Sequence, residues 1–166
     1  MLIRSGLAYG KPLMSNVRSP MFRTRSTALL FALSSLATTP ASAQPSFTGN
    51  WYIDLRSSEQ RQQKAECGEA YFKLLQVGDQ VTGDHGFVTV GCGRLNEGGE
   101  ETVKGVVVGA TAVLVVTSGR NGGMVLGKAA RRGDNLYWVT LEELKPGEPE
   151  GDSLLILGEG LLKPRK

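Results

Sequence analysis

The sequence predicts an all-β fold, an eight-stranded antiparallel up-and-down barrel, from three observations. Short apolar or alternating runs recur about every ten to fifteen residues, as strands do in such proteins. Helical periodicity is nearly absent. Turn-forming residues separate neighbouring runs, so each run can pair with the one before it as a hairpin. A two-sheet β-sandwich, which can hold the same strands, is the alternative.

The opening 43 residues are expected to be a signal peptide. Arg23 and Arg25 form its basic start, and an apolar run at 27–36 follows. This run is far too short to span a bilayer. The small residues that end at Ala43 suit a signal peptidase, so we expect cleavage after Ala43.

The expected compartment follows from this leader. Residues 44–166 would form a single barrel domain that is periplasmic or secreted. A start at Met21 instead of Met1 would leave a leader of ordinary length. No cysteine lies directly after the apolar run, so a lipid anchor is not expected. No other stable membrane anchor is expected either.

Cleavage would change the charge of the chain. The full sequence holds 19 Lys and Arg and 16 Asp and Glu. Five basic residues lie in the leader, whereas every acidic residue lies after it. Subtracting five from 19 leaves 14 basic against 16 acidic residues, a net charge of about −2. A nucleic-acid partner is therefore not expected.

Two cysteines, Cys67 and Cys92, remain in the mature chain. An exported protein meets an oxidising compartment, where such a pair normally joins, so we expect one disulfide. Their spacing is not that of a redox pair, and His85 is the only histidine. The sequence therefore predicts no metal site and no cofactor.

Eight strands and one short helix are expected in the mature chain. The strands are predicted at residues 48–55, 70–77, 80–90, 102–108, 111–118, 124–130, 135–141 and 153–162. The polar run at 57–65 could form a helix of one or two turns. Pairs that tolerate the positive φ angles of tight turns lie at 78–79, 109–110, 121–122 and 133–134.

The first strand shows the clearest alternation. Phe47, Gly49, Trp51, Ile53 and Leu55 share one face, and the residues between them are mostly polar. Since successive side chains of a strand point to opposite faces, the face with the tryptophan is expected to point inward.

The same segment carries a resemblance to known families. Residues 47–51, Phe-Thr-Gly-Asn-Trp, resemble the G-x-W opening of lipocalins and avidins, the calycin group. They are also similar to the opening of small periplasmic barrel inhibitors of secreted metalloproteases, which carry one disulfide. No second lipocalin motif is present, and Trp138 is the only other tryptophan. The resemblance implies a barrel.

Connections alternate between the two ends of an up-and-down barrel, so the first, third, fifth and seventh share one end. These are the long ones, at residues 56–69, 91–101, 119–123 and 142–152. We call the end that they form the long-loop rim. The disulfide falls at the same end, because one cysteine lies in the first connection and the other begins the third.

Two polar, glycine-rich segments of the rim hold the candidate binding residues, which are Arg94, Asn96, Glu97, Arg120 and Asn121. Arginine and exposed backbone N–H groups suit an anionic or carbonyl-bearing partner. The alternative is that the charges are solvated and the glycines serve turns. In that interpretation Arg94 and Glu97 pair with each other, or Arg94 pairs with Glu66.

Catalysis has little support in the sequence. His85 follows Asp84, and with Ser118 it could be drawn as a triad. A surface histidine away from the rim is the expectation. The sequence therefore predicts a non-enzymatic binding module that recognises a protein partner or a small ligand with the long-loop rim. An inhibitor of an exported hydrolase and an enzyme of unrecognised type are the alternatives.

Three runs, at 106–108, 113–116 and 154–157, are apolar on both faces of their predicted strands. If one face packs inside the barrel, the other leaves apolar side chains outside, which suggests a homodimer or another partner. The lumen would distinguish the ligand classes, since a filled lumen favours a protein partner and an open one a small ligand.

Overall fold

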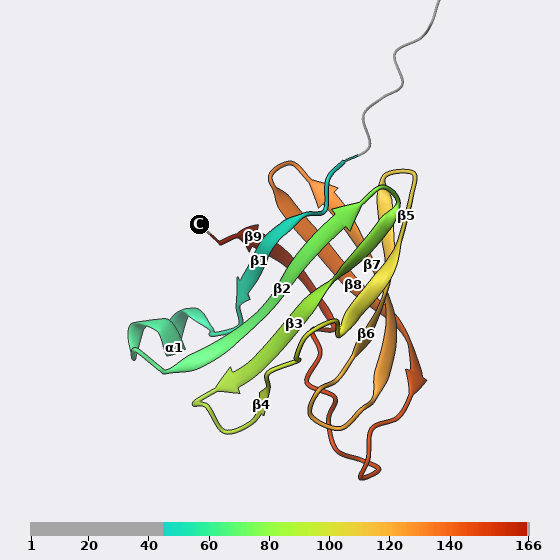
Figure 1. The fold of residues 1–166 in the computed structure, drawn as a ribbon. Coiled ribbons are helices and arrows are strands. Elements are labelled where there is room, and N and C mark those ends of the chain that lie inside the picture. The colour runs from blue at the N-terminus through green and yellow to red at the C-terminus, as the bar shows by residue number, and fades with distance from the viewer. Residues whose placement is uncertain (1–44, 166) are drawn as a thin grey trace, which may run out of the picture. The chain divides into compact units, whose positions relative to one another are not determined.

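Nine strands and one helix make up residues 45–165, the part of the chain that the computed structural model describes (Figure 1). The elements are β1 (Gly49–Asp54), α1 (Ser58–Gln62), β2 (Cys67–Val77), β3 (Gln80–Val90), β4 (Leu95–Asn96), β5 (Val103–Val108), β6 (Thr111–Thr117), β7 (Met124–Arg132), β8 (Asn135–Lys145) and β9 (Glu159–Pro164). The predicted signal peptide and its cleavage site lie outside the described residues.

The strands form a closed antiparallel barrel, as predicted. Around the barrel the order is β1, β2, β3, β5, β6, β7, β8 and β9, and β9 returns to β1. The closing pairs are Trp51 with Pro164 and Tyr52 with Lys163. The two-residue strand β4 pairs with β3 alone and lies outside this ring. Because the sheet closes on itself, the sandwich alternative is excluded.

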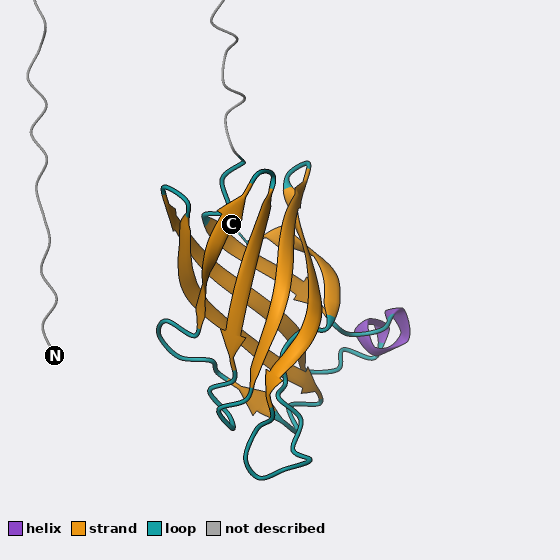
Figure 2. Ribbon diagram, turned by 90° about the vertical axis from the view of Figure 1, so that its right-hand side faces the viewer, coloured by secondary structure: helices purple, strands orange, loops and turns teal. Residues whose placement is uncertain are grey.

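The two ends of the barrel differ (Figure 2). Connections of two residues join β2 to β3, β5 to β6 and β7 to β8 at one end. The long connections lie at the other end, so the long-loop rim is present as predicted. The helix α1 belongs to the first of them. Its N-cap is Ser57, whose hydroxyl accepts a hydrogen bond from the backbone N–H of Gln60.

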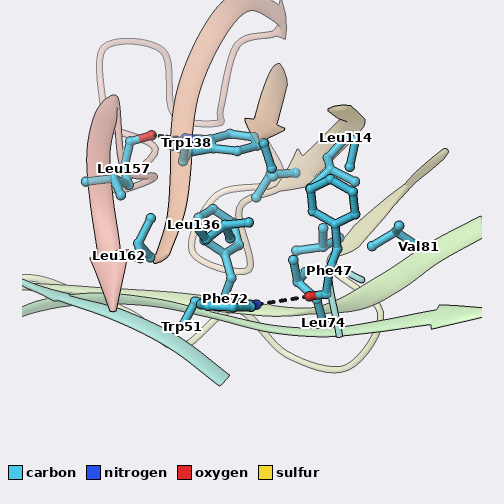
Figure 3. Packing of buried hydrophobic residues seen from close by; sticks show 14 of the residues in the cluster. Phe47, Trp51, Phe72, Leu74, Val81, Leu114, Leu136, Trp138, Leu157 and Leu162 are labelled. Atoms are coloured by element: carbon cyan, nitrogen blue, oxygen red, sulfur yellow. Dashed lines mark hydrogen bonds between the residues drawn. The ribbon is translucent and has the colours of Figure 1, made fainter. Parts of the chain in front are cut away.

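The predicted inward face of the first strand is confirmed. Phe47 and Trp51 are buried, and Ile53 and Leu55 pack against the core. The indole Nε1 of Trp51 donates to the carbonyl oxygen of Phe47 at 3.0 Å, so its polar atom is satisfied inside the apolar core (Figure 3).

Side chains fill the lumen (Figure 3). The rings of Phe72 and Trp138 lie 4.9 Å apart, and Trp138 donates from Nε1 to the carbonyl oxygen of Leu157 at 2.7 Å. Gly127 makes room for this indole, since a Cβ atom there would lie 2.1 Å from the ring. The narrow circumference of an eight-stranded barrel leaves an interior that large side chains can occupy completely.

The last strand differs from its prediction, because it begins at Glu159 and residues 153–158 form no ladder. Three of their carbonyl groups accept hydrogen bonds from side chains instead. Leu154 and Leu155 accept from the amide of Asn96. Leu157 accepts from Trp138. Side-chain donors have therefore replaced a neighbouring strand.

Three other strands are longer than predicted. β2 begins at Cys67, which pairs with Val90, and β7 continues to Arg132. The added residues of β7 lie at the end with the two-residue turns. β8 continues to Lys145 toward the rim, with irregular register against β7 near Met124.

A disulfide joins Cys67 to Cys92, with 5.3 Å between their Cα atoms. It connects the start of β2 to the loop that follows β3, and so ties the first and third connections of the rim together. We expect Cys67→Ser to lower the free energy of unfolding by about 3 kcal/mol, because a loop of this length gains that much conformational freedom in the unfolded chain.

Thermal unfolding followed by circular dichroism tests this expectation. Before unfolding, the far-ultraviolet spectrum of the variant should match that of the wild type, which shows that the fold is kept. Cys92→Ser is the matched variant and should behave alike. Thiols that react with Ellman's reagent in the oxidised, folded wild type would contradict the pairing.

Candidate functional site

The side-chain amide of Asn96 closes the rim end of the lumen. Asn96 is 1% exposed. Its Nδ2 lies 3.0 Å from Nε2 of His85, 3.2 Å from Oγ of Ser118, and 3.0 and 3.1 Å from the carbonyl oxygens of Leu154 and Leu155. The two hydrogens of this amide are shared among these four acceptors, and through them it connects β3, the end of β6 and the segment before β9. Its oxygen accepts from the N–H of Gly98 at 3.0 Å, which also holds the following loop.

The expectation of a surface His85 is wrong. Its side chain is 1% exposed and points into the lumen. His85 and the buried Val81 lie four residues apart on β3, and inward positions of a strand recur at every second residue. His85 also reaches the rim, contrary to expectation, because Asn96 lies directly against its ring.

The hydrogen bonds around His85 define its neutral tautomer. An amide N–H₂ can only donate, so Nε2 of His85 accepts from Asn96. The proton is then on Nδ1, which donates to Oγ1 of Thr102 at 3.0 Å. The hydroxyl of Thr102 in turn donates a hydrogen bond to the carbonyl oxygen of Gly99. Burial lowers the pKa of His85 to about 4, and the charge of Asp84 opposes this shift only in part.

Ser118 is buried beside this network, at 1% exposure. Its hydroxyl donates to the carbonyl oxygen of Leu154 at 2.8 Å and accepts from Asn96. The amide of Asn96 therefore lies between Ser118 and His85, with no hydroxyl-to-imidazole hydrogen bond between them. A serine nucleophile needs such a bond to its base.

A second cluster lies on the outer side of the rim, around Asp152. Arg94 donates from Nη2 to Oδ1 at 2.7 Å, and Arg120 donates from Nε to Oδ2 at 2.8 Å. Asn121 donates from Nδ2 to the backbone carbonyl oxygen of Asp152 at 3.2 Å. Three of the five predicted residues thus converge on one acidic residue of the last long loop. Hydrogen bonding first from Arg120 and then from Arg94 holds the pKa of Asp152 below its ordinary value.

These contacts correct the predicted roles of two residues. Arg94 pairs with Asp152, and neither Glu97 nor Glu66 is its ion-pair partner. Asn96 is buried, so its side chain organises the loops and does not face a partner. Glu97 is exposed, and its backbone carbonyl accepts from the hydroxyl of Tyr71.

A cleft of about 340 Å³ opens on the rim between the loop after β4 and the loop after β6. Its lining residues are Leu95, Asn96, Glu97, Gly98, Gly99, Gly119 and Arg120. The two loops pack backbone against backbone, since a Cβ atom on Gly119 would lie 1.8 Å from the carbonyl oxygen of Gly98. Some rim glycines are thus required by close packing and not only by turns.

Acidic residues dominate the rim. Residues 91–101, 119–123 and 142–152 together hold eight Asp and Glu against three Lys and Arg. Both arginines already pair with the single carboxylate of Asp152. Within residues 45–165, no ion pair engages four rim carboxylates, those of Glu97, Glu100, Glu148 and Glu150. The two arginines that were predicted to attract an anion are therefore already paired with a carboxylate.

The sequence prediction missed Asp152 and the inward position of His85. A signal was present for each. Asp152 belongs to a long loop that was predicted to lie at the same end as Arg94 and Arg120, and His85 follows the apolar Val81 at an even spacing. The contact of Asn96 with Leu154 had no local signal, since 58 residues separate them.

The described chain adds two observations. Residues 45–165 contain no cluster of three or more His, Cys, Asp or Glu side chains arranged to hold a metal ion. No helix in that range has the length and apolar character needed to cross a membrane.

Comparisons with protein-family models, curated proteins and solved structures find no match to the chain.

We expect acid to destabilise the fold through His85. Its pKa is about 4 when folded, whereas the ordinary value is 6.5, so the unfolded chain binds a proton more readily between these values. The stability is fully present above about pH 6.5 and is lost as the pH falls toward 4. Urea denaturation should show a loss of about 2 kcal/mol between about pH 7 and pH 5.

His85→Gln is the control, because it removes the only histidine and its titration. Its stability should vary less over the same interval. NMR titration of the His85 ring in the folded wild type gives a readout independent of that variant, and a midpoint near the ordinary histidine value would contradict the buried, neutral ring.

The two arginines should affect the pKa of Asp152 unequally. Arg120 makes two hydrogen bonds to the carboxylate, and Arg94 makes one. We expect both Arg120→Gln and Arg94→Gln to raise the pKa of Asp152, with the larger rise in Arg120→Gln. Carboxyl-detected NMR measures it, and equal shifts or none would show that the bridge does not persist in solution.

Proposed function

We propose that the mature chain is an exported, non-enzymatic barrel that binds a protein partner with its long-loop rim. The observation that carries this proposal is the filled lumen, in which Phe72, Leu114 and Trp138 are each at most 1% exposed. Lipocalin-like binding of a small molecule would need that space. Recognition is therefore assigned to the outer surface.

The rim loops are held in fixed positions, and this supports their use in binding. The disulfide holds the start of the third connection, and Asp152 ties that connection to the fifth and seventh. Loops held in place before binding lose less conformational entropy when they bind. Exposed Leu95, at 47%, and Glu97 lie beside the cleft, where a partner could cover them.

Charge indicates the kind of partner. The surplus of carboxylates on the rim suits a protein surface that carries Lys or Arg, and such attraction raises association rates at low salt. The free carboxylates replace the arginines as the groups proposed to select the partner.

Inhibition of an exported hydrolase is the more specific form of this proposal. Its support is the G-x-W opening at Gly49 and Trp51, the single disulfide and the filled eight-stranded barrel, which together resemble the small periplasmic protease inhibitors. An enzymatic role has less support, because the amide of Asn96 occupies the position between Ser118 and His85.

The test uses residues 44–166 immobilised and exposed to the exported protein fraction of the source organism, with quantitative mass spectrometry of what is retained. The rim variant Glu97→Lys with Glu100→Lys should lose the specific partner. Lys73→Glu, at an exposed position of β2 outside the rim loops, is the control and should keep it.

A partner recovered equally by all three proteins would overturn the rim assignment. Retention that persists after the protein in the fraction is digested would indicate a small ligand and overturn the protein-partner assignment. A captured hydrolase whose activity falls at equimolar barrel would select the inhibitor form.

A further inference from the structure

A second surface, separate from the rim, lies on the outer face of β5, β6, β7 and β8, which stand next to one another in the barrel (Figure 1). Apolar side chains alternate outward there because the inward positions of these strands form the core. Val106 is 47% exposed and Val108 is 63% exposed. Exposed valines on a sheet face need a covering surface or carry a cost in solubility.

Strand register arranges this face in rows. One row across the four strands runs Lys104, Val115, Leu126, Glu142. The next runs Val106, Val113, Lys128, Val139, and the third runs Val108, Thr111, Ala130, Tyr137. We call these three rows the β5–β8 face. Its first row ends in a cation on one edge and an anion on the other.

That order of charges is self-complementary. Consider two copies placed face to face and related by a twofold axis that runs along the strands between β6 and β7. The rotation exchanges the β5 edge of one copy with the β8 edge of the other and keeps each row opposite itself. Lys104 then lies on the same flank of the dimer as Glu142 of the second copy, twice, and Val115 faces Leu126 between these flanks.

We propose that the β5–β8 face binds a second copy of this chain in this orientation. In the second row Val106 meets Val139 of the second copy, and the aliphatic part of Lys128 lies over Val113 while its ammonium group extends toward water. A twofold axis across the strands would instead place Lys104 against Val108 and desolvate the charge without a partner. Face-to-face sheets also pack with their strands nearly aligned, as the proposed axis requires.

Existing contacts leave the two charges available. Lys104 pairs with Glu101 at 2.9 Å, but the two side chains are 62% and 73% exposed, and such surface pairs exchange at little cost. Within residues 45–165, Glu142 has no ion-pair partner.

The orientation has a consequence for the rim. Rotation about an axis along the strands leaves the strand direction unchanged, so both long-loop rims lie toward the same side of the dimer. Two rims on one side can engage a repeated or dimeric partner together, which multiplies the apparent affinity. The dimer does not depend on the proposed function of the rim and is tested without any partner.

Sedimentation velocity of residues 44–166 over about 5 to 500 µM tests the dimer, since interfaces of a few strands commonly associate weakly. Wild type should shift from monomer to dimer with concentration. Val106→Glu should weaken association by about tenfold or more. Val77→Glu, at an outward valine of β2 that is 70% exposed, is the matched control and should leave association unchanged.

Charge reversal tests the orientation. Lys104→Glu and Glu142→Lys should each weaken self-association, because like charges then face each other twice. An equimolar mixture of the two variants should associate about as well as wild type, because each mixed dimer restores both opposite-charge contacts. This rescue cannot arise from a loss of folding.

A wild type that stays monomeric up to about 1 mM would overturn the proposal and leave the face to another occupant. A dimer that tolerates Val106→Glu, or a mixture that fails to recover association, would place the contact elsewhere on the barrel.

Discussion

Closure between β1 and β9 is the constraint on which the rest of this structure depends. Only two pairs join these strands, Trp51 with Pro164 and Tyr52 with Lys163, yet they convert an open sheet into a ring of eight. A ring of that size has a narrow lumen, which aromatic and branched side chains can fill. Phe72 packs against Trp138 there. With the interior occupied, recognition is left to the loops and the outer face.

The two ends of the ring are closed by different means. Two-residue turns close one end. At the other, the buried amide of Asn96 binds groups from β3, from the end of β6 and from the segment before β9. A buried polar group of this kind stabilises only when its hydrogen bonds are made. Asn96 therefore fixes the loop arrangement, while His85 makes that arrangement sensitive to acid. Outside this layer, the disulfide and Asp152 hold the same loops from the surface.

The outer surface then divides into two regions of different chemistry. The rim is acidic and carries a cleft, whereas the β5–β8 face is mostly apolar, with one charge at each edge of its first row and Lys128 in its second. Continuous apolar runs in β5 and β6 produce this division, because alternate side chains of one run must point outward once the others fill the lumen. The proposed self-association face and the proposed partner-binding rim have only Glu142 in common, so the two can coexist.

By itself the sequence determined the elements and their order. The alternation of apolar and polar residues predicted that Phe47 and Trp51 point inward, and turn pairs such as Gly133-Asp134 predicted the hairpins. The lengths of the loops distinguished the two ends of the barrel. All three patterns depend only on residues that are neighbours in the sequence. Those patterns also brought Arg94, Arg120 and Asn121 to one rim. Only the tertiary structure decided that Asp152 pairs with both arginines, that Asn96 is buried and that Leu154 lies outside the strand ladder. Such contacts join residues tens of positions apart, and which donor finds which acceptor is settled when the closed barrel brings them within hydrogen-bond distance.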